Sequence, residues 1–177
     1  MGSSADYDPK SVDSILSYAR NLVGKTLAEV TVADAGLANT RNRGDLGTLV
    51  QNLYFGLTSD GKSEPDFAEA GVELKTTGVR KNSRGAFTAK ERLVLMMIDF
   101  EKIVDEQWET SSLLLKCRLI LLLAYLYEED TSVLNRRFVL EPYLLDLLSA
   151  DFPSLKTDWE AIRDKIAAGQ AHELSEG

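Results

Sequence analysis

The sequence predicts an α/β fold of mixed α+β character, in which a central β-sheet is flanked by helices. Apolar residues recur at helical spacing over residues 15–23, 46–54 and 159–166, and a short helix is expected over residues 110–115. Between the outer helices the pattern changes to alternation or to short apolar runs, at residues 72–76, 93–98, 119–127 and 133–140. Helices near both ends with strands between them are typical of a sheet covered by helices.

Turn residues separate these elements. Gly24, Gly56 and Gly169 stand where C-cap glycines would end the first, second and last helix. Residues 58–65 are polar and contain Gly and Pro, which predicts a loop. Residues 80–85 supply a hairpin turn, and we expect it to lead into a strand made by the next apolar run and buried on both faces.

Length and composition limit the organisation of the chain. With 177 residues, 44% of them hydrophobic, it can bury one core, so we expect a single domain over residues 9–177 after a leader at residues 1–8. No apolar run reaches membrane-spanning length, and residues 1–10 lack the apolar segment of a signal peptide. One cysteine, Cys117, excludes an internal disulfide, and we expect a cytoplasmic protein.

Charge is distributed unevenly along the chain. A net charge of -8 disfavours a protein that coats nucleic acid, because affinity for the phosphate backbone rests on accumulated Lys and Arg. A basic segment nevertheless lies between residues 75 and 92, where Glu91 is the single acid. Its cations are Lys75, Arg80, Lys81, Arg84, Lys90 and Arg92. A solvated hairpin would explain these charges as well as a nucleic-acid contact would.

Two other kinds of site are disfavoured. A single histidine, His172, excludes zinc and histidine-metal centres, which need more ligands, and Cys117 is expected in the core rather than in a dyad with it. Residues 56–63 match the phosphate-loop pattern GxxxxGK[ST]. That motif needs a strand before it and a helix after it, whereas here a helical pattern precedes and an alternating run follows. A nucleotide-binding protein that uses Lys62 is kept as an alternative.

The strongest candidate site combines two carboxylates and an amine. Glu73 and Lys75 leave the same face of an alternating strand, and Asp66 precedes them across a reversal that contains Gly71. Cleavage of a phosphodiester needs a divalent cation, an activated water and positive charge near the reacting phosphate. Asp66 and Glu73, with the Leu74 carbonyl, offer hard oxygen ligands for Mg²⁺. Lys75 would orient or deprotonate the water. A half-exposed strand with an ordinary Glu-x-Lys pair is the alternative.

Longer segments add a family resemblance. They are KSEPDFAEAGVELK at 62–75, KERLVLMMIDFEKIVDE at 90–106, WETSSLLLK at 108–116 and DWEAIRDKIAAGQAHELSEG at 158–177. These segments resemble the family of the mismatch-repair nicking enzyme MutH and its type II restriction relatives that cut at GATC, a group of PD-(D/E)xK nucleases. The similarity covers residues 44–177, and KERLVL and ETSS are more similar to the restriction branch.

The resemblance implies a restriction-endonuclease-like fold and Mg²⁺-dependent hydrolysis of double-stranded DNA at GATC, with Mn²⁺ able to substitute and Ca²⁺ supporting binding without cleavage. It places the family's catalytic residues on Asp66, Glu73, Lys75 and, as a further basic residue, Lys116. Arg43, with Arg41 beside it, falls where relatives contact a backbone phosphate. Further contacts to phosphates or base edges are expected from Arg80, Lys81, Lys90 and Arg92. A homodimer on DNA is one arrangement of the intact protein.

Two departures from the family pattern leave alternatives open. Gln51 occupies a place where relatives carry a glutamate that reaches the metal centre, so one negative charge is missing. Relatives also continue past HELSEG into an arm that contributes base contacts. We therefore expect an N-terminal fragment of a longer protein, with the remainder of that protein as a partner. A DNA-binding module of the same fold without activity is the alternative function.

Overall fold

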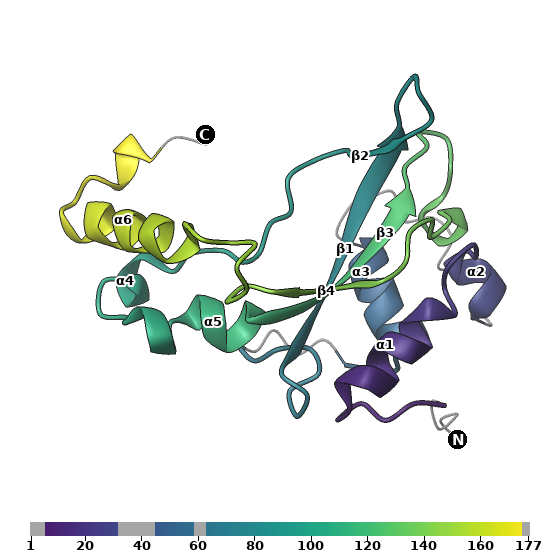
Figure 1. Ribbon diagram of the computed structural model, residues 1–177, viewed down its shortest axis with the longest axis horizontal. Helices are drawn as coiled ribbons and strands as arrows, with labels where there is room; N and C mark the ends of the chain where they lie inside the picture. The colour runs from purple at the N-terminus through teal and green to yellow at the C-terminus, as the bar shows by residue number, and fades with distance from the viewer. Residues whose placement is uncertain (1–5, 32–44, 59–62, 175–177) are drawn as a thin grey trace.

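The computed structural model describes residues 6–31, 45–58 and 63–174. A four-stranded sheet in the order β2-β1-β3-β4 forms its centre (Figure 1). The strands are β1 (Val72–Lys81), β2 (Phe87–Ala89), β3 (Leu119–Leu126) and β4 (Tyr143–Asp146). β1 and β3 run parallel, whereas β2 and β4 pair antiparallel with β1 and β3. The predicted mixed sheet flanked by helices is therefore confirmed.

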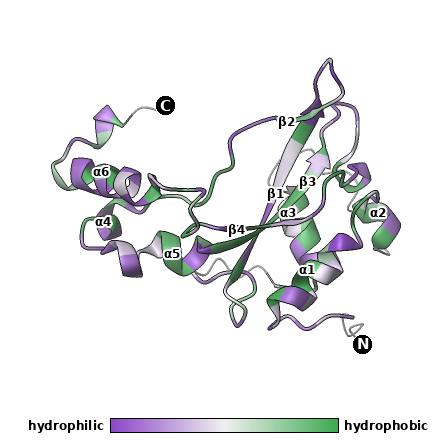
Figure 2. Cartoon of the chain, viewed as in Figure 1, coloured by the Kyte–Doolittle hydropathy of each residue, from purple (hydrophilic) through white to green (hydrophobic). Residues whose placement is uncertain are grey.

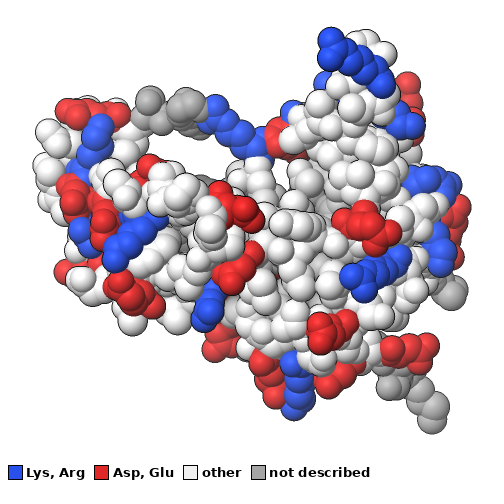
Figure 3. Space-filling view, in the orientation of Figure 1, with Lys and Arg blue, Asp and Glu red and all other residues white. Residues whose placement is uncertain are grey.

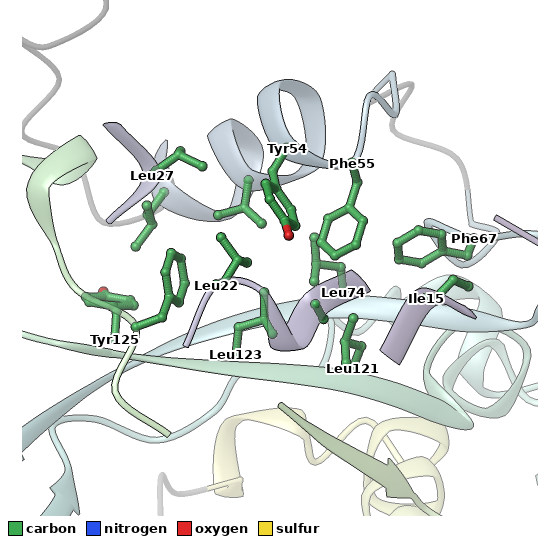
Figure 4. Close-up of a cluster of buried hydrophobic side chains, with 14 of the residues drawn as sticks. Ile15, Leu22, Leu27, Tyr54, Phe55, Phe67, Leu74, Leu121, Leu123 and Tyr125 are labelled. Carbon is green, nitrogen blue, oxygen red and sulfur yellow. The ribbon is translucent and has the colours of Figure 1, made fainter. Parts of the chain in front are cut away.

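One face of the sheet is covered by the N-terminal helices α1 (Val12–Arg20), α2 (Leu27–Val30) and α3 (Asp45–Leu49), and α3 continues as the π-helix η2 (Val50–Tyr54). α1 begins at Ser11, whose side chain accepts a hydrogen bond from the Ser14 amide. The main core lies between these helices and the strands (Figure 4). Its buried members include Ile15, Leu22, Leu27, Phe67, Leu121 and Leu123. Helix and strand periodicities thus meet in one hydrophobic layer, as the sequence predicts.

A second group of helices lies on the other side of the sheet (Figure 1). It comprises α4 (Phe100–Ile103), α5 (Ser112–Cys117), α6 (Leu155–Ala167) and the 3₁₀ turns η3 (Trp108–Thr110) and η5 (Ala171–Glu173). The rings of Trp108 and Trp159 lie 5.7 Å apart at the centre of its separate apolar cluster. Hydrophobic and hydrophilic residues alternate along these helices (Figure 2), as expected of helices that bury one side. The group therefore has its own small core.

The expected strand at residues 93–98 is wrong. This segment forms no strand and instead connects β2 to α4 as an extended link. Leu95 packs inwards and its carbonyl accepts a hydrogen bond from Cys117 Sγ at 3.4 Å, whereas Met97 is 84% exposed. An apolar run indicates burial but does not say whether a neighbouring strand edge is available to pair with it.

The strand expected at residues 133–140 is also wrong. The segment contains the 3₁₀ turn η4 (Val133–Asn135) and two isolated bridges, one from Arg137 to Thr26 and one from Phe138 to Tyr125. The partner of β3 on this side is β4, further along the chain. Val133, Leu134 and Phe138 are buried nevertheless, so the apolar pattern correctly marked a core segment and missed its conformation.

The hairpin after β1 is confirmed, with a different second strand. Its turn occupies residues 82–85, where Gly85 has φ +78 and the Asn82 side chain accepts hydrogen bonds from the amides of Arg84 and Ala86. The returning strand is the short β2. Because the ladder with β2 covers only Val79–Lys81, no strand of the described chain pairs with this edge of β1 near Leu74.

The N-terminal residues that the structure describes are attached to the core. Tyr7 donates a hydrogen bond to the Phe55 carbonyl at 2.7 Å and stacks on Tyr18 at 4.6 Å, so packed structure begins before position 9. Among the residues placed here, no helix is long and apolar enough to span a membrane.

Replacing Leu121 with Ala tests the central core. Leu121 is fully buried in β3, so Leu121→Ala should lower the free energy of unfolding by about 2–5 kcal/mol through lost burial and a residual cavity. Leu115→Ala is the control, because Leu115 is 64% exposed and its loss should change stability by less than about 0.5 kcal/mol. Urea unfolding of both variants measures the difference, and equal effects would contradict the described core.

Candidate active site

The candidate site is built on the open edge of β1. β3 pairs with one edge of β1, and residues before Val79 have no strand on the other edge within the described chain. Val72 uses this open edge, because its amide and carbonyl both bond to Phe67. Leu74 lies two residues on, and its amide donates to Asp66 Oδ2 at 2.9 Å. Since the N–H and C=O of one strand residue point to the same side, the Leu74 carbonyl also faces Asp66.

Asp66 is fixed from three directions. Besides the bond from Leu74, Asp66 Oδ1 accepts a hydrogen bond from Gln51 Nε2 at 2.7 Å, and the Asp66 amide donates to Glu73 Oε2 at 3.3 Å. Gln51 comes from the π-helical turn η2, so the N-terminal helices reach the same edge of the sheet. These contacts bring Gln51, Asp66 and Glu73 together.

Glu73 and Lys75 share one face of β1. Glu73 is 3% exposed, and its Oε1 lies 2.9 Å from Lys75 Nζ and 4.0 Å from Lys116 Nζ. Lys116 comes from α5, in the second helical group. A buried carboxylate without cations would be strongly destabilised, and these two amines compensate its charge. Lys75 therefore points towards the carboxylates and not away from them.

Burial and charge together shift the ionisation of Asp66. Removal from solvent raises the pKa of Asp66 above its ordinary value, and the negative charge of Glu73 raises it further. The Leu74 amide and the amines of Lys116 and Lys75 lower this pKa but do not cancel the increase. The charge of Glu73 thus disfavours ionisation of Asp66. A cation bound by these acids would offset that repulsion and favour the ionised carboxylate.

The oxygen donors at this edge fit a magnesium ion. In the described residues no group of three or more His, Cys, Asp and Glu side chains converges, so the protein offers two carboxylates and one backbone carbonyl. Mg²⁺ retains several waters and is commonly held by one or two carboxylates together with substrate phosphate. Asp66, Glu73 and Leu74 match that requirement, whereas a zinc site would need further N or S ligands.

A solvent-accessible hollow of about 430 Å³ adjoins the Glu73 carboxylate. It is lined by Ser63, Glu73, Lys75, Lys116 and the link at residues 94–97. The two amines and the buried acid are therefore reachable from solvent. Sequence reasoning missed the contribution of the link, because the apolar run suggested a buried strand.

The predicted phosphate contacts differ in exposure. Arg80, Lys81 and Arg92 are exposed, and cations gather at the tip of the β1–β2 hairpin (Figure 3). Lys90 differs, because its Nζ is buried over the ring of Tyr127 at 3.5 Å. Arg41 and Arg43 lie outside the described residues. The expected contact of Lys90 with DNA therefore stays a prediction, and it starts from a buried amine rather than from an exposed one.

Two alternative sites lose support. Helical residues lead into Gly56, which itself has φ +68, so no strand precedes the phosphate-loop pattern as nucleotide binding requires; Lys62 lies outside the described residues. Cys117 is fully buried, and burial raises the pKa of its thiol to about 11, with the Glu73 charge adding to the shift. Cys117 is thus a protonated core residue, as predicted, and the exposed His172 belongs to η5.

Comparison with known proteins identifies the family. The family model for MutH, described as DNA mismatch repair enzyme MutH, matches residues 55–158. The chain belongs to the MutH family. The DNA mismatch repair protein MutH of Shewanella woodyi is 30% identical over 174 residues, which are 96% of this chain and 72% of that protein. MutH of Escherichia coli strain SMS-3-5 is 30% identical over 171 residues, covering 94% of this chain and 72% of the relative.

The restriction branch is represented as well. The type II restriction enzyme Sau3AI of Staphylococcus aureus is 40% identical over 166 residues. That match covers 93% of this chain and 33% of the enzyme, so the chain spans about a third of this relative. The predicted resemblance to MutH and to its restriction relatives is confirmed, and both the family description and the name of Sau3AI are those of enzymes.

The raised pKa of Asp66 predicts a pH dependence of stability in the absence of metal. Because the folded chain binds this proton more tightly than the unfolded chain, the free energy of unfolding should fall as pH rises from the ordinary value of 3.8 through the folded value. Asp66→Asn lacks this titration, so its stability relative to the wild type should increase over the same interval. Urea unfolding in EDTA between pH 4 and pH 7 measures it, and parallel pH profiles would contradict the expectation.

Proposed function

We propose that this member of the MutH family is a site-specific DNA endonuclease that hydrolyses phosphodiester bonds in duplex DNA with Mg²⁺. One observation carries the proposal: Asp66, Glu73 and Lys75 meet at the open edge of β1, and Glu73 and Lys75 line a solvent-accessible hollow there. MutH and the type II restriction enzyme Sau3AI are the relatives that support this activity.

The residues divide the chemistry between them. Asp66, Glu73 and the Leu74 carbonyl would hold Mg²⁺, which when bound supplies a Lewis acid for a phosphate oxygen and lowers the pKa of a water. The Leu74 amide and Gln51 fix the carboxylate of Asp66 by hydrogen bonds to its two oxygens. Lys75, 2.9 Å from Glu73, orients the attacking water and stabilises negative charge at the phosphate. Lys116 adds a second positive charge on the same carboxylate.

The target sequence and the metal preferences that we propose rest on the resemblance to the restriction relatives. We propose GATC as the target sequence, Mn²⁺ as a substitute for Mg²⁺, and Ca²⁺ as an ion that supports binding without cleavage. The exposed Arg80, Lys81 and Arg92 would contact DNA, with Arg41 and Arg43 as further phosphate contacts. A homodimer on DNA, and a further region of the intact protein that reads bases, complete the proposed assembly.

A second candidate is a DNA-binding module of the same fold with little or no activity. Gln51 favours it, because its amide donates to Asp66 Oδ1 at 2.7 Å, at a place where the family resemblance implies a glutamate. An amide adds no charge for a cation, so affinity for metal is lower than with glutamate. Binding of DNA would then survive while cleavage is weak.

Lys75→Ala tests the proposed cutting centre. With a GATC-containing duplex and Mg²⁺, the variant should lose at least about 100-fold in cleavage rate, because an amine that stabilises the transition state is removed. Lys156→Ala is the matched control, since Lys156 is an exposed lysine paired with Glu109 in the second helical group. Cleavage assays with Mg²⁺ and binding assays with Ca²⁺ separate the candidates. DNA binding without cleavage by the wild type would favour the inactive module.

Gln51→Glu tests the missing charge. A carboxylate 2.7 Å from Asp66 would add a third negative charge, so the variant should bind Mg²⁺ at least about tenfold more tightly and cleave faster. Gln51→Ala is the control, because it removes the hydrogen bond without adding charge. Metal titration followed by thermal unfolding reports affinity independently of cleavage. Unchanged affinity in Gln51→Glu would place the metal away from this edge.

A further inference from the structure

A second group of cations lies further along β1. Lys90 Nζ stands 3.5 Å from the ring centroid of Tyr127, and the guanidinium carbons of Arg80 and Arg136 are each 5.1 Å from the same centroid. Arg136 also lies 5.3 Å from the ring of Tyr125. Three positive charges therefore converge on one tyrosine side chain. Like charges gathered in this way repel each other, and the electron-rich ring faces offset part of that repulsion.

Two of the three cations are buried without a partner. Arg136 is 6% exposed, and its Nε and Nη1, like Lys90 Nζ, are buried with no hydrogen-bond acceptor. None of the three pairs with an acid in the part of the chain that the structure describes. A buried charge without an acceptor is strongly destabilising, because it loses hydration and gains no hydrogen bond. The cluster therefore lacks a negatively charged group that would supply oxygen acceptors.

The cluster lies beside the same edge of β1 as the candidate active site but on the other face of the sheet, because Arg80 is an odd number of residues from Glu73 and Lys75 in the strand. The Lys90 amide donates to the Gly78 carbonyl at 2.9 Å, and Gly78 lies four residues after Leu74, so both carbonyls face the same edge. Four strand residues span about 13 Å. The Lys90 side chain packs against β1 at Gly78, where a Cβ would lie in van der Waals contact, 3.5 Å from Lys90 Cδ. Arg80 is the exposed member of the cluster, so an anion would approach from its side, and Lys90 Nζ and the Arg136 guanidinium would turn towards it from their buried positions.

We propose that Arg80, Lys90 and Arg136 form a phosphate-binding site, and that its occupant is a backbone phosphate of the DNA held at Asp66, Glu73 and Lys75. This assignment rests on the proposed nuclease function. A phosphate presents several strong acceptor oxygens, and the planar guanidinium of Arg136 can bind two of them at once. Each strand of a duplex carries a phosphate every 3.4 Å along the axis. A duplex bound at Asp66, Glu73 and Lys75 therefore also has phosphates about 13 Å from that site, which is the span of four strand residues.

Arg136→Met tests the site, with Arg137→Met as the matched control. Both changes remove one positive charge, but Arg137 is exposed and pairs with Glu29 at 3.2 Å. DNA binding is measured with Ca²⁺ at several salt concentrations. Arg136→Met should weaken binding about tenfold and reduce the slope of log affinity against log salt by about 1, whereas Arg137→Met should leave that slope unchanged. An unchanged slope in Arg136→Met overturns the assignment to DNA.

Thermal unfolding separates a phosphate site from a structural role. A methionine removes the unpaired charge and keeps the apolar stem, so without ligand Arg136→Met should melt at or above the wild-type temperature. A lower melting temperature with an unchanged salt slope would show that Arg136 has only a structural role, in packing on Tyr125 and Tyr127, and would overturn the proposal. If Arg136→Met does not fold, Lys90→Met replaces it, with the same expected loss of salt slope.

Inorganic phosphate distinguishes the source of the anion. It should raise the melting temperature of the wild type and not of Arg136→Met; failure to stabilise the wild type would contradict an anion site. Stabilisation by phosphate with an unchanged DNA salt slope would assign the site to the free ion and overturn the DNA assignment. If the wild type does not bind DNA with Ca²⁺, the proposed nuclease function fails, while the phosphate measurement still decides whether the cations bind an anion.

Discussion

The hydrogen bond from the Leu74 amide to Asp66 is the interaction on which the candidate site depends. It is available because β2 pairs with the far end of β1 and leaves the edge near Leu74 open. If another strand paired there, the amide and carbonyl of Leu74 would form hydrogen bonds within the sheet and could not face Asp66. The open edge instead brings Asp66, from a loop, beside Glu73, from the strand. Two acids seven residues apart in the sequence thereby lie next to each other.

The same arrangement explains why both helical groups are needed around the sheet. Gln51 reaches Asp66 from the N-terminal helices, and Lys116 reaches Glu73 from α5 on the other side. Each group contributes one polar side chain to an edge that neither covers. Burial of Glu73 is tolerated because Lys75 and Lys116 supply positive charge on its open side. Stability of the sheet and chemistry at its edge therefore depend on the same few contacts.

Sequence reasoning succeeded where a pattern has one physical interpretation. The alternation around Glu73 and Lys75 fixes a shared face, and Asp66 lies before the strand across a reversal, so their meeting could be anticipated. The run at residues 93–98 was misread because hydrophobicity does not reveal which strand edge is free. Arg136 gave no signal, since its neighbour Arg137 is chemically identical and lies exposed in an ion pair with Glu29. Only tertiary packing on Tyr125 and Tyr127 distinguishes the two arginines.

The π-helical turn at Val50–Tyr54 has a consequence for how this site can vary. In a wide turn each residue advances less around the axis than in an α-helix, so the direction of Gln51 depends on a local backbone irregularity. Conversion of that turn to regular α-helix would rotate everything after it, while leaving the strand that carries the acid and the amine untouched. The side chain that lies beside Asp66 can therefore change in two ways, by rotation of the helix about its axis or by substitution of residue 51.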